Sequence, residues 1–296
     1  MSTRTTGIGL AFVTSIVSGV AIYVNGHAVR HFGDATVYTT AKNAVAGVLL
    51  LALAAAPGRV AVPAVGRQRR SLAYLSVAVL GGSVPFVLFF EGLARAEATQ
   101  AGFIQKTLVI WVAALAVPLL HERFRLPHLV AVAFLVGGQA WLVGSTGTIA
   151  FGTGEAMIVG ATLLWAVEVV WVRRLLSASR LQPRALAAAR MACGSCLLVA
   201  WVAVNGHASQ LTSLDAAQWR WVVGTGLLLT AYVGTWYSAL ARAQAVDVTA
   251  VLVFGAVVTA LLADGVRVNV GGAGLIGAGT LVVALAALRA PARVST

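Results

Sequence analysis

Two lysines lie inside long apolar runs, and they are the only lysines in the 296-residue chain. Lys42 lies in the run Ala35 to Ala56, and Lys106 lies in the run Thr99 to Leu120. A charge at the centre of a membrane helix costs about 2.5 to 3.5 kcal/mol on translocon-type scales, so such groups pair or face water and are functional candidates. The rest of the basic charge is supplied by arginine, so neither position needed lysine for its charge alone.

Three more ionisable residues lie inside apolar runs: Glu91, Glu168 and Arg190. At 1.5 Å of rise per residue, Lys42 and Lys106 lie about 10 Å below the outer surface, with Glu91 shallower on the same side. Glu168 and Arg190 lie about as far from the inner surface. Because one carboxylate cannot neutralise two lysines, we expect a lysine to line a wet cavity, where it binds an anionic group such as a carboxylate or releases a proton during transport.

Each of these residues also has a structural interpretation. Glu91 could pair with one of the lysines and lock two helices, or reach Arg95 one turn further on. Glu168 is either a proton or cation site or the structural partner of Arg190, which is close enough to the inner end to extend its side chain towards water. These alternatives stay open at the level of sequence.

Aromatic and amide side chains accompany the buried charges. Trp165 shares a helix face with Glu168, and Tyr38 lies one turn before Lys42. Gln105 adds an amide beside Lys106. The complete set of candidate substrate-binding or coupling residues, with the two lysines first, is Lys106, Lys42, Glu91, Glu168, Arg190, Trp165, Gln105 and Tyr38.

The elements that position these residues are predicted to be membrane-spanning helices. With 59% hydrophobic and 10% charged residues, the chain has more apolar side chain than one soluble core can hide. Continuous apolar runs of about 20 residues indicate spanning helices rather than barrel strands. We predict an all-α integral membrane protein with ten spans: Gly7 to Asn25, Ala35 to Ala56, Leu72 to Ala94, Thr99 to Leu120, Pro127 to Gly144, Gly154 to Leu176, Ala185 to Val204, Trp219 to Ala241, Val246 to Val266 and Gly271 to Leu288.

The formal net charge of +12 comes from arginines that sort by membrane side. When the loops are assigned alternately to the two sides, 14 of the 19 arginines fall on the side of both termini and four on the other side. The positive-inside rule therefore predicts that both termini are cytoplasmic. The arginines do not form a polar patch on a folded surface, so we expect no nucleic-acid partner.

The chain contains an internal repeat. Leu93-Ala94-Arg95-Ala96 at the end of the third span recurs 147 residues later as Leu240-Ala241-Arg242-Ala243, and Lys42 aligns with Arg190 at an offset of 148. Five helices per half is an odd number, so the second half enters from the opposite side. We predict an inverted-topology repeat, with residues 1–148 as the first half and 149–296 as the second, the usual construction of secondary transporters.

Residues at the end of the fourth span resemble a known family. Pro118 precedes the loop His121-Glu122-Arg123-Phe124-Arg125, and Gly137-Gly138 lies in the next helix. With the five-plus-five inverted repeat, this is similar to the EamA family of the drug/metabolite transporter superfamily, in which a Pro precedes Gly-Glu-Arg. Here His121 replaces the Gly, and the second copy has Asp264-Gly265-Val266. The resemblance implies a bundle of ten helices that moves small organic molecules, often by export of amino acids or related metabolites.

No motif in the chain indicates an enzyme. The sequence has no HExxH, no GxSxG and no paired acidic motif. Cys193 and Cys196 form a CxxC inside the seventh span, where small packing residues are a better explanation than a metal site. We therefore expect no catalytic residues, no metal and no cofactor.

These observations predict a multi-pass transporter of a bacterial-type cytoplasmic membrane. We expect alternating-access export of a small polar metabolite, an amino acid or another carboxylate, with proton coupling compatible with the buried charges. The alternative is an exporter of amphipathic or cationic, drug-type compounds that uses Glu168 or Glu91 as its cation or proton site. Besides its substrate, the lipid bilayer is the expected partner, and the protein is expected to be a monomer or a homodimer.

Overall fold

The computed structural model describes residues 3–56, 67–93, 95–96, 104–122, 126–143, 151–178, 181–264 and 270–289. These residues form helices and turns, and no β-strand occurs among them. The helical segments are α1 (Thr3–Ala28), η1 (Val29–His31), α2 (Ala35–Ala55), α3 (Arg67–Val77), η2 (Ala78–Ser83), α4 (Val84–Leu93), α6 (Leu108–Leu120), α7 (Leu126–Val143), α8 (Thr153–Ala178), α9 (Pro183–Val204), α10 (Ala208–Thr212), α11 (Ala216–Leu240), α12 (Ala245–Leu252), α13 (Gly255–Asp264) and α14 (Val270–Arg289).

Local signals explain where several of these helices begin and end. The carboxylate of Asp34 accepts hydrogen bonds from the first amides of α2, and Asp215 forms a capping box with Gln218 at the start of α11. Pro183 opens α9, where its missing N–H removes no intrahelical bond. His121 adopts φ 52° directly after α6, a left-handed conformation that ends the helix.

The all-helical prediction is confirmed, and seven of the described helices are long and apolar enough to cross a membrane. Two shorter apolar helices, Ile104–Leu120 and Leu126–Gly138, cover the fourth and fifth predicted spans, and α11 covers the eighth. The count of ten spans and the cytoplasmic position of both termini stay predictions. Of the loop that resembles the family motif, residues 123–125 lie outside the described part of the chain, as do residues 265–266 of the second copy.

Three predicted spans are not continuous α-helices. The third runs through α3, the π-helical segment η2 and α4. The fourth is helical over residues 104–106, turns at Thr107 and continues as α6. The ninth turns at Val253 and Phe254 between α12 and α13. Apolar content alone does not reveal the turn in the ninth span, because Val253 and Phe254 are as hydrophobic as the helical residues around them.

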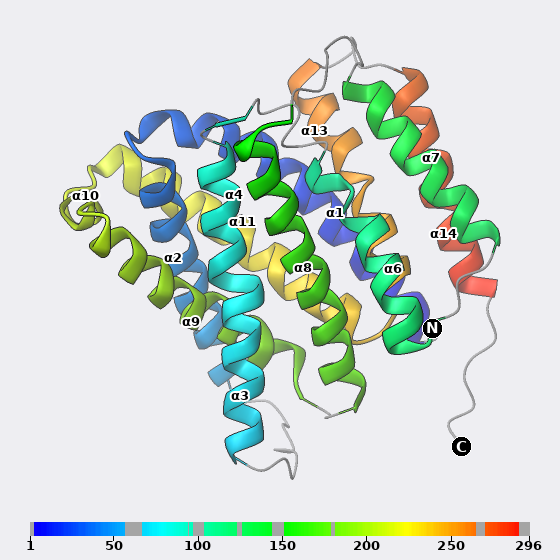
Figure 1. Ribbon diagram of the computed structural model, residues 1–296, viewed down its shortest axis with the longest axis horizontal. Helices are drawn as coiled ribbons and strands as arrows, with labels where there is room; N and C mark the ends of the chain where they lie inside the picture. Colours follow the sequence, from blue (N-terminus) through cyan, green and yellow to red (C-terminus); the bar gives the residue numbers. More distant parts are fainter. Residues whose placement is uncertain are drawn as a thin grey trace.

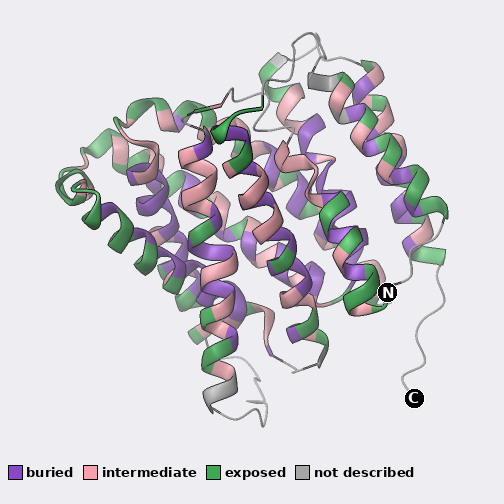
Figure 2. Cartoon of the chain, viewed as in Figure 1, coloured by how far each residue is buried: buried purple, intermediate pink, exposed green. Residues whose placement is uncertain are grey.

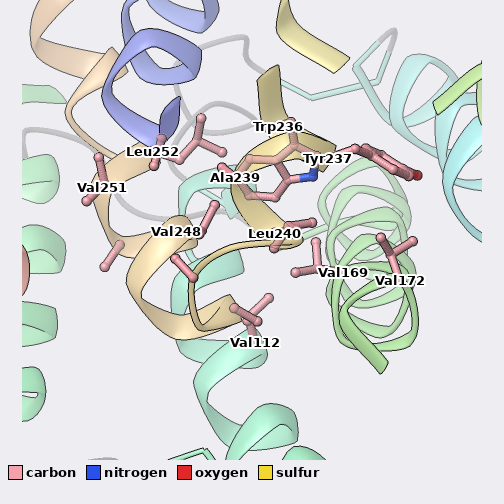
Figure 3. Packing of buried hydrophobic residues seen from close by; sticks show 14 of the residues in the cluster. Val112, Val169, Val172, Trp236, Tyr237, Ala239, Leu240, Val248, Val251 and Leu252 are labelled. Carbon is pink, nitrogen blue, oxygen red and sulfur yellow. The ribbon is translucent and has the colours of Figure 1, made fainter. Parts of the chain in front are cut away.

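The helices pack into one bundle. In Figure 1, α7 and α14 lie side by side at the right, and α2 lies beside α9 on the left. Valines of α6, α8 and α12 belong to the same apolar cluster as Trp236 and Tyr237 of α11 (Figure 3). Exposed residues lie on the outer faces of the bundle (Figure 2). Many of them are large and apolar, for example Leu51 and Leu129, as expected for surfaces that meet lipid.

The glycine-rich tenth span packs closely, as its composition predicts. A Cβ added to Gly279 of α14 would lie 2.9 Å from the carbonyl oxygen of Ala131 in α7, and one added to Gly138 of α7 would lie 2.8 Å from that of Gly272. Small residues let two membrane helices approach to backbone contact. The pair of α7 and α14 therefore depends on these glycines.

Candidate functional site

A buried cluster of polar side chains joins three helices in the second half of the chain. Glu168 of α8 is 1% exposed, Arg190 of α9 is 6% exposed and Tyr237 of α11 is fully buried. The Tyr237 hydroxyl donates a hydrogen bond to Oε1 of Glu168. The Arg190 guanidinium lies 6.0 Å from the centroid of the Tyr237 ring. Tyr237 thus lies between the carboxylate and the guanidinium, which the sequence offered as one possible structural pair.

Arg190 interacts with Glu168 through space rather than by contact. Among the described residues no carboxylate oxygen lies within 4.0 Å of its guanidinium, although Glu168, Tyr237 and Tyr232 are within electrostatic reach. Its Nε is buried and makes no hydrogen bond in the described part of the chain. A buried donor without a partner is uncommon and calls for an explanation such as water or a bound ligand.

The π-helical turn η2 makes room for this cluster. A Cβ added to Gly81 would lie 2.7 Å from Cγ of Glu168, so only glycine leaves space for the carboxylate. The indole Nε1 of Trp165, one turn before Glu168, donates a hydrogen bond to the Gly81 carbonyl at 3.3 Å. The rings of Phe86 and Phe89 in α4 each lie 5.5 Å from Trp165. Short π-helical segments are frequent at functional sites.

Lys42 lies in a separate polar group in the first half. Its ammonium donates a hydrogen bond to Oδ1 of Asn25 at 3.1 Å and lies 4.9 Å from the centroid of the Tyr38 ring. The Tyr38 hydroxyl donates to the same Asn25 oxygen. The structure therefore brings Lys42 and Tyr38 together as predicted. Asn25 was missed, although an amide at the end of an apolar span is a recognisable signal.

The helix that carries Lys42 also holds polar atoms without partners. Asn43 is fully buried, and neither its amide nitrogen nor its oxygen makes a hydrogen bond within the described residues. The hydroxyl oxygens of Thr39 and Thr40 are also buried and make no hydrogen bond within the described residues. Four buried polar atoms in five consecutive residues indicate that water or a polar ligand reaches this part of α2.

Lys106 lies at an interruption of its span. Gln105 and Lys106 are half-buried and end the short helical stretch 104–106, and the Thr107 amide donates a hydrogen bond to the Ile104 carbonyl at 3.1 Å. In the second half the span turns at Val253 and Phe254, 147 residues after Lys106 and Thr107. The two repeats are therefore interrupted at matching positions. Discontinuous helices commonly carry the binding sites of secondary transporters.

Glu91 pairs with neither lysine. Its Oε2 lies 2.6 Å from Nη1 of Arg95, one turn further along the chain, and both side chains are partly exposed. No ion pair joins a carboxylate to Lys42 or Lys106 in the part of the chain that the structure covers. Glu91 thus takes the partner that the sequence offered as its structural alternative, and neither lysine has a carboxylate partner among the described residues.

Another polar group, which the sequence analysis did not predict, surrounds the start of α12. The Glu122 carboxylate accepts hydrogen bonds from the amides of Ala245 and Val246 at 2.8 and 3.2 Å. Arg173 of α8 lies 3.6 Å from Glu122. Burial raises the pKa of the Glu122 carboxyl, while the two amides and the Arg173 charge oppose that shift. The loop that resembles the family motif therefore caps a helix of the other half.

Asp247 completes this group in the first turn of α12. It is fully buried, and Arg4 of α1 lies 2.8 Å from its Oδ2. Nε2 of His128 in α7 lies 3.2 Å from its Oδ1. No cluster of three or more His, Cys, Asp or Glu side chains suited to a metal ion occurs in the described residues.

Comparisons with known proteins agree with this architecture. The model of the EamA-like transporter family matches residues 5–144 and again residues 152–289. No curated protein matches the chain. A solved structure, titled only as the crystal structure of a protein, is similar in fold, with a TM-score of 0.74 and 17% sequence identity over 96% of this chain and 99% of that one.

Proposed function

The chain belongs to the EamA-like transporter family, a family of multi-pass membrane transporters in the drug/metabolite transporter superfamily, and from this premise we propose that it exports a small carboxylate, an amino acid above all, by alternating access. The two repeats, residues 1–148 and 149–296 in our division, would move against each other around the substrate. The cytoplasmic membrane is the proposed location, with a monomer or homodimer as the working unit.

The observation that carries this proposal is the unneutralised basic charge at membrane depth. Lys42 and Lys106 lie within spans, and neither has a carboxylate within 4.0 Å in the described part of the chain. A substrate carboxylate would supply the missing negative charge while it is bound. Because a charge left alone at this depth is unfavourable, the same groups that bind the carboxylate would favour a hydrated cavity when it has left.

Glu168 supports two roles within this proposal. It would bind the ammonium of an amino acid or take up a proton during the cycle. A drug-type exporter of organic cations is the second candidate, and the aromatic rings favour it, because Trp165, Phe86 and Phe89 gather one turn from Glu168. Aromatic faces beside a carboxylate attract organic cations.

Transport assays with lysine variants distinguish the carboxylate exporter from the drug-type exporter. In proteoliposomes supplied with labelled amino acids, carboxylates that lack an amine, and organic cations, Lys106→Ala and Lys42→Ala should each reduce carboxylate flux by about tenfold or more, the loss expected from one charged hydrogen bond. The control is Arg30→Ala, which removes an exposed cation from η1 and should leave flux unchanged. Unchanged carboxylate flux in both lysine variants, with cation flux lost in Glu168→Gln, would favour the drug-type exporter.

A further inference from the structure

The polar group around the start of α12 connects the two halves of the chain at every contact. Arg4, Glu122 and His128 lie in residues 1–148, the first half in our division, whereas Asp247 and Arg173 lie in the second half. The amides that Glu122 caps also belong to the second repeat. Any motion that separates α12 from α1, Glu122 and α7 must break the contacts that Arg4, Glu122 and His128 make with α12 together.

α12 can move as a unit because its span is interrupted. It ends at Leu252, and the chain turns at Val253 and Phe254 before α13 begins at Gly255. Such a turn lets one segment tilt without unfolding the other, as in other hinged elements. The polar group holds the end of α12 that lies away from this turn, where a contact has the greatest leverage on its position.

The internal repeat shows that the fold does not require this group. At the offset of 147 residues, the five side chains correspond to Phe151, Gln100, Asn269, Leu275 and Gly26, none of which is charged. At this offset, residues 98–105 are the counterpart of α12. The charges around α12 therefore have no counterpart at the equivalent positions of the other repeat, which indicates a role specific to α12.

We propose that Arg4, Glu122, His128, Arg173 and Asp247 form the inner gate lock, which holds α12 closed over the cytoplasmic end of the pathway until transport opens it. With this lock formed, the substrate-free protein rests closed to the side that the arginine distribution assigns to the cytoplasm. Inward opening then consists of α12 leaving Glu122, Arg4 and His128 and tilting at the turn before α13.

Cysteine labelling of α12 tests the lock without any substrate. In a Cys193→Ser, Cys196→Ser background, Thr249→Cys places one thiol on α12, where Thr249 is buried. Asp247→Asn should raise the rate at which a membrane-impermeant maleimide, added on the face of the arginine-rich loops, labels this thiol by about tenfold, the shift expected when a closed state loses a buried ion pair. His128→Gln should raise it by a smaller factor.

Glu155→Gln is the matched control. Glu155 is also a buried carboxylate near a helix start, where it accepts a hydrogen bond from the Gly152 amide, but it belongs to α8 and lies outside the lock. It should leave the labelling rate of Thr249→Cys unchanged. If Asp247→Asn does not fold, Arg4→Gln and His128→Gln decide the question. Labelling that matches the parent in every folded lock variant overturns the proposal, and the carboxylate proposal is judged separately by flux.

Discussion

Glu168→Gln should lower the free energy of unfolding by about 3 kcal/mol, because it leaves the Arg190 charge buried without a compensating carboxylate. Arg190 is only 6% exposed, so water cannot compensate its guanidinium for the lost carboxylate. Thermal unfolding of the purified protein in detergent measures the effect. Tyr237→Phe, which removes only one hydrogen bond to Glu168, should cost about 1 kcal/mol.

A double variant separates a structural pair from a functional one. Glu168→Gln combined with Arg190→Gln removes both charges, so it should regain most of the stability that the single variant loses. If the two residues only stabilise the bundle, transport should return with stability. If they bind substrate or a proton, the double variant should fold and remain inactive. Equal stability of Glu168→Gln and the parent protein would show that the two charges do not depend on each other.

The helices could be predicted because the signal that forms them is local. Each span is a run of apolar residues long enough to cross a membrane, and caps such as Asp34 and Asp215 lie beside the residues they serve. The interruptions were harder to predict. The π-helical turn of the third span contains Gly81 and Gly82, whereas Thr107 and Val253 carry no signal that distinguishes a turn from a helix.

The site shows the same division between local and distant signals. Tyr38 and Lys42, or Trp165 and Glu168, lie on one helix, so their spacing was enough to place them together. The lock around α12 joins Arg4 to Asp247 across 243 positions, and only the packing of the whole bundle brings them into contact. The lysines within the spans were identified from the sequence, but their partners were not. Glu91 pairs with Arg95 instead, because a partner one turn away along the chain needs no tertiary contact.

Gly82→Ala should prevent normal packing of η2 against α9. An added Cβ would lie 2.0 Å from the carbonyl oxygen of Arg190 and 3.1 Å from Cα of Gly194. Both neighbours are backbone, so no side chain can turn aside, and the two helices must separate. Overpacking of this kind costs about 1 to 3 kcal/mol and occasionally more, and contact with backbone on both sides places this variant at the upper end.

The comparison that isolates this clash is Gly224→Ala in α11. A Cβ at Gly224 meets nothing within 4 Å, and alanine favours a helix over glycine by about 0.5 to 1 kcal/mol, so this variant should be as stable as the parent or slightly more so. Thermal unfolding in detergent and the yield of monodisperse protein measure the stability of both glycine variants. Because the Gly82 contact is made with Arg190 itself, Gly82→Ala should also displace that guanidinium and reduce transport in whatever protein folds. A Gly82→Ala variant as stable and active as Gly224→Ala would mean that the close approach of η2 and α9 is not what positions the buried charges.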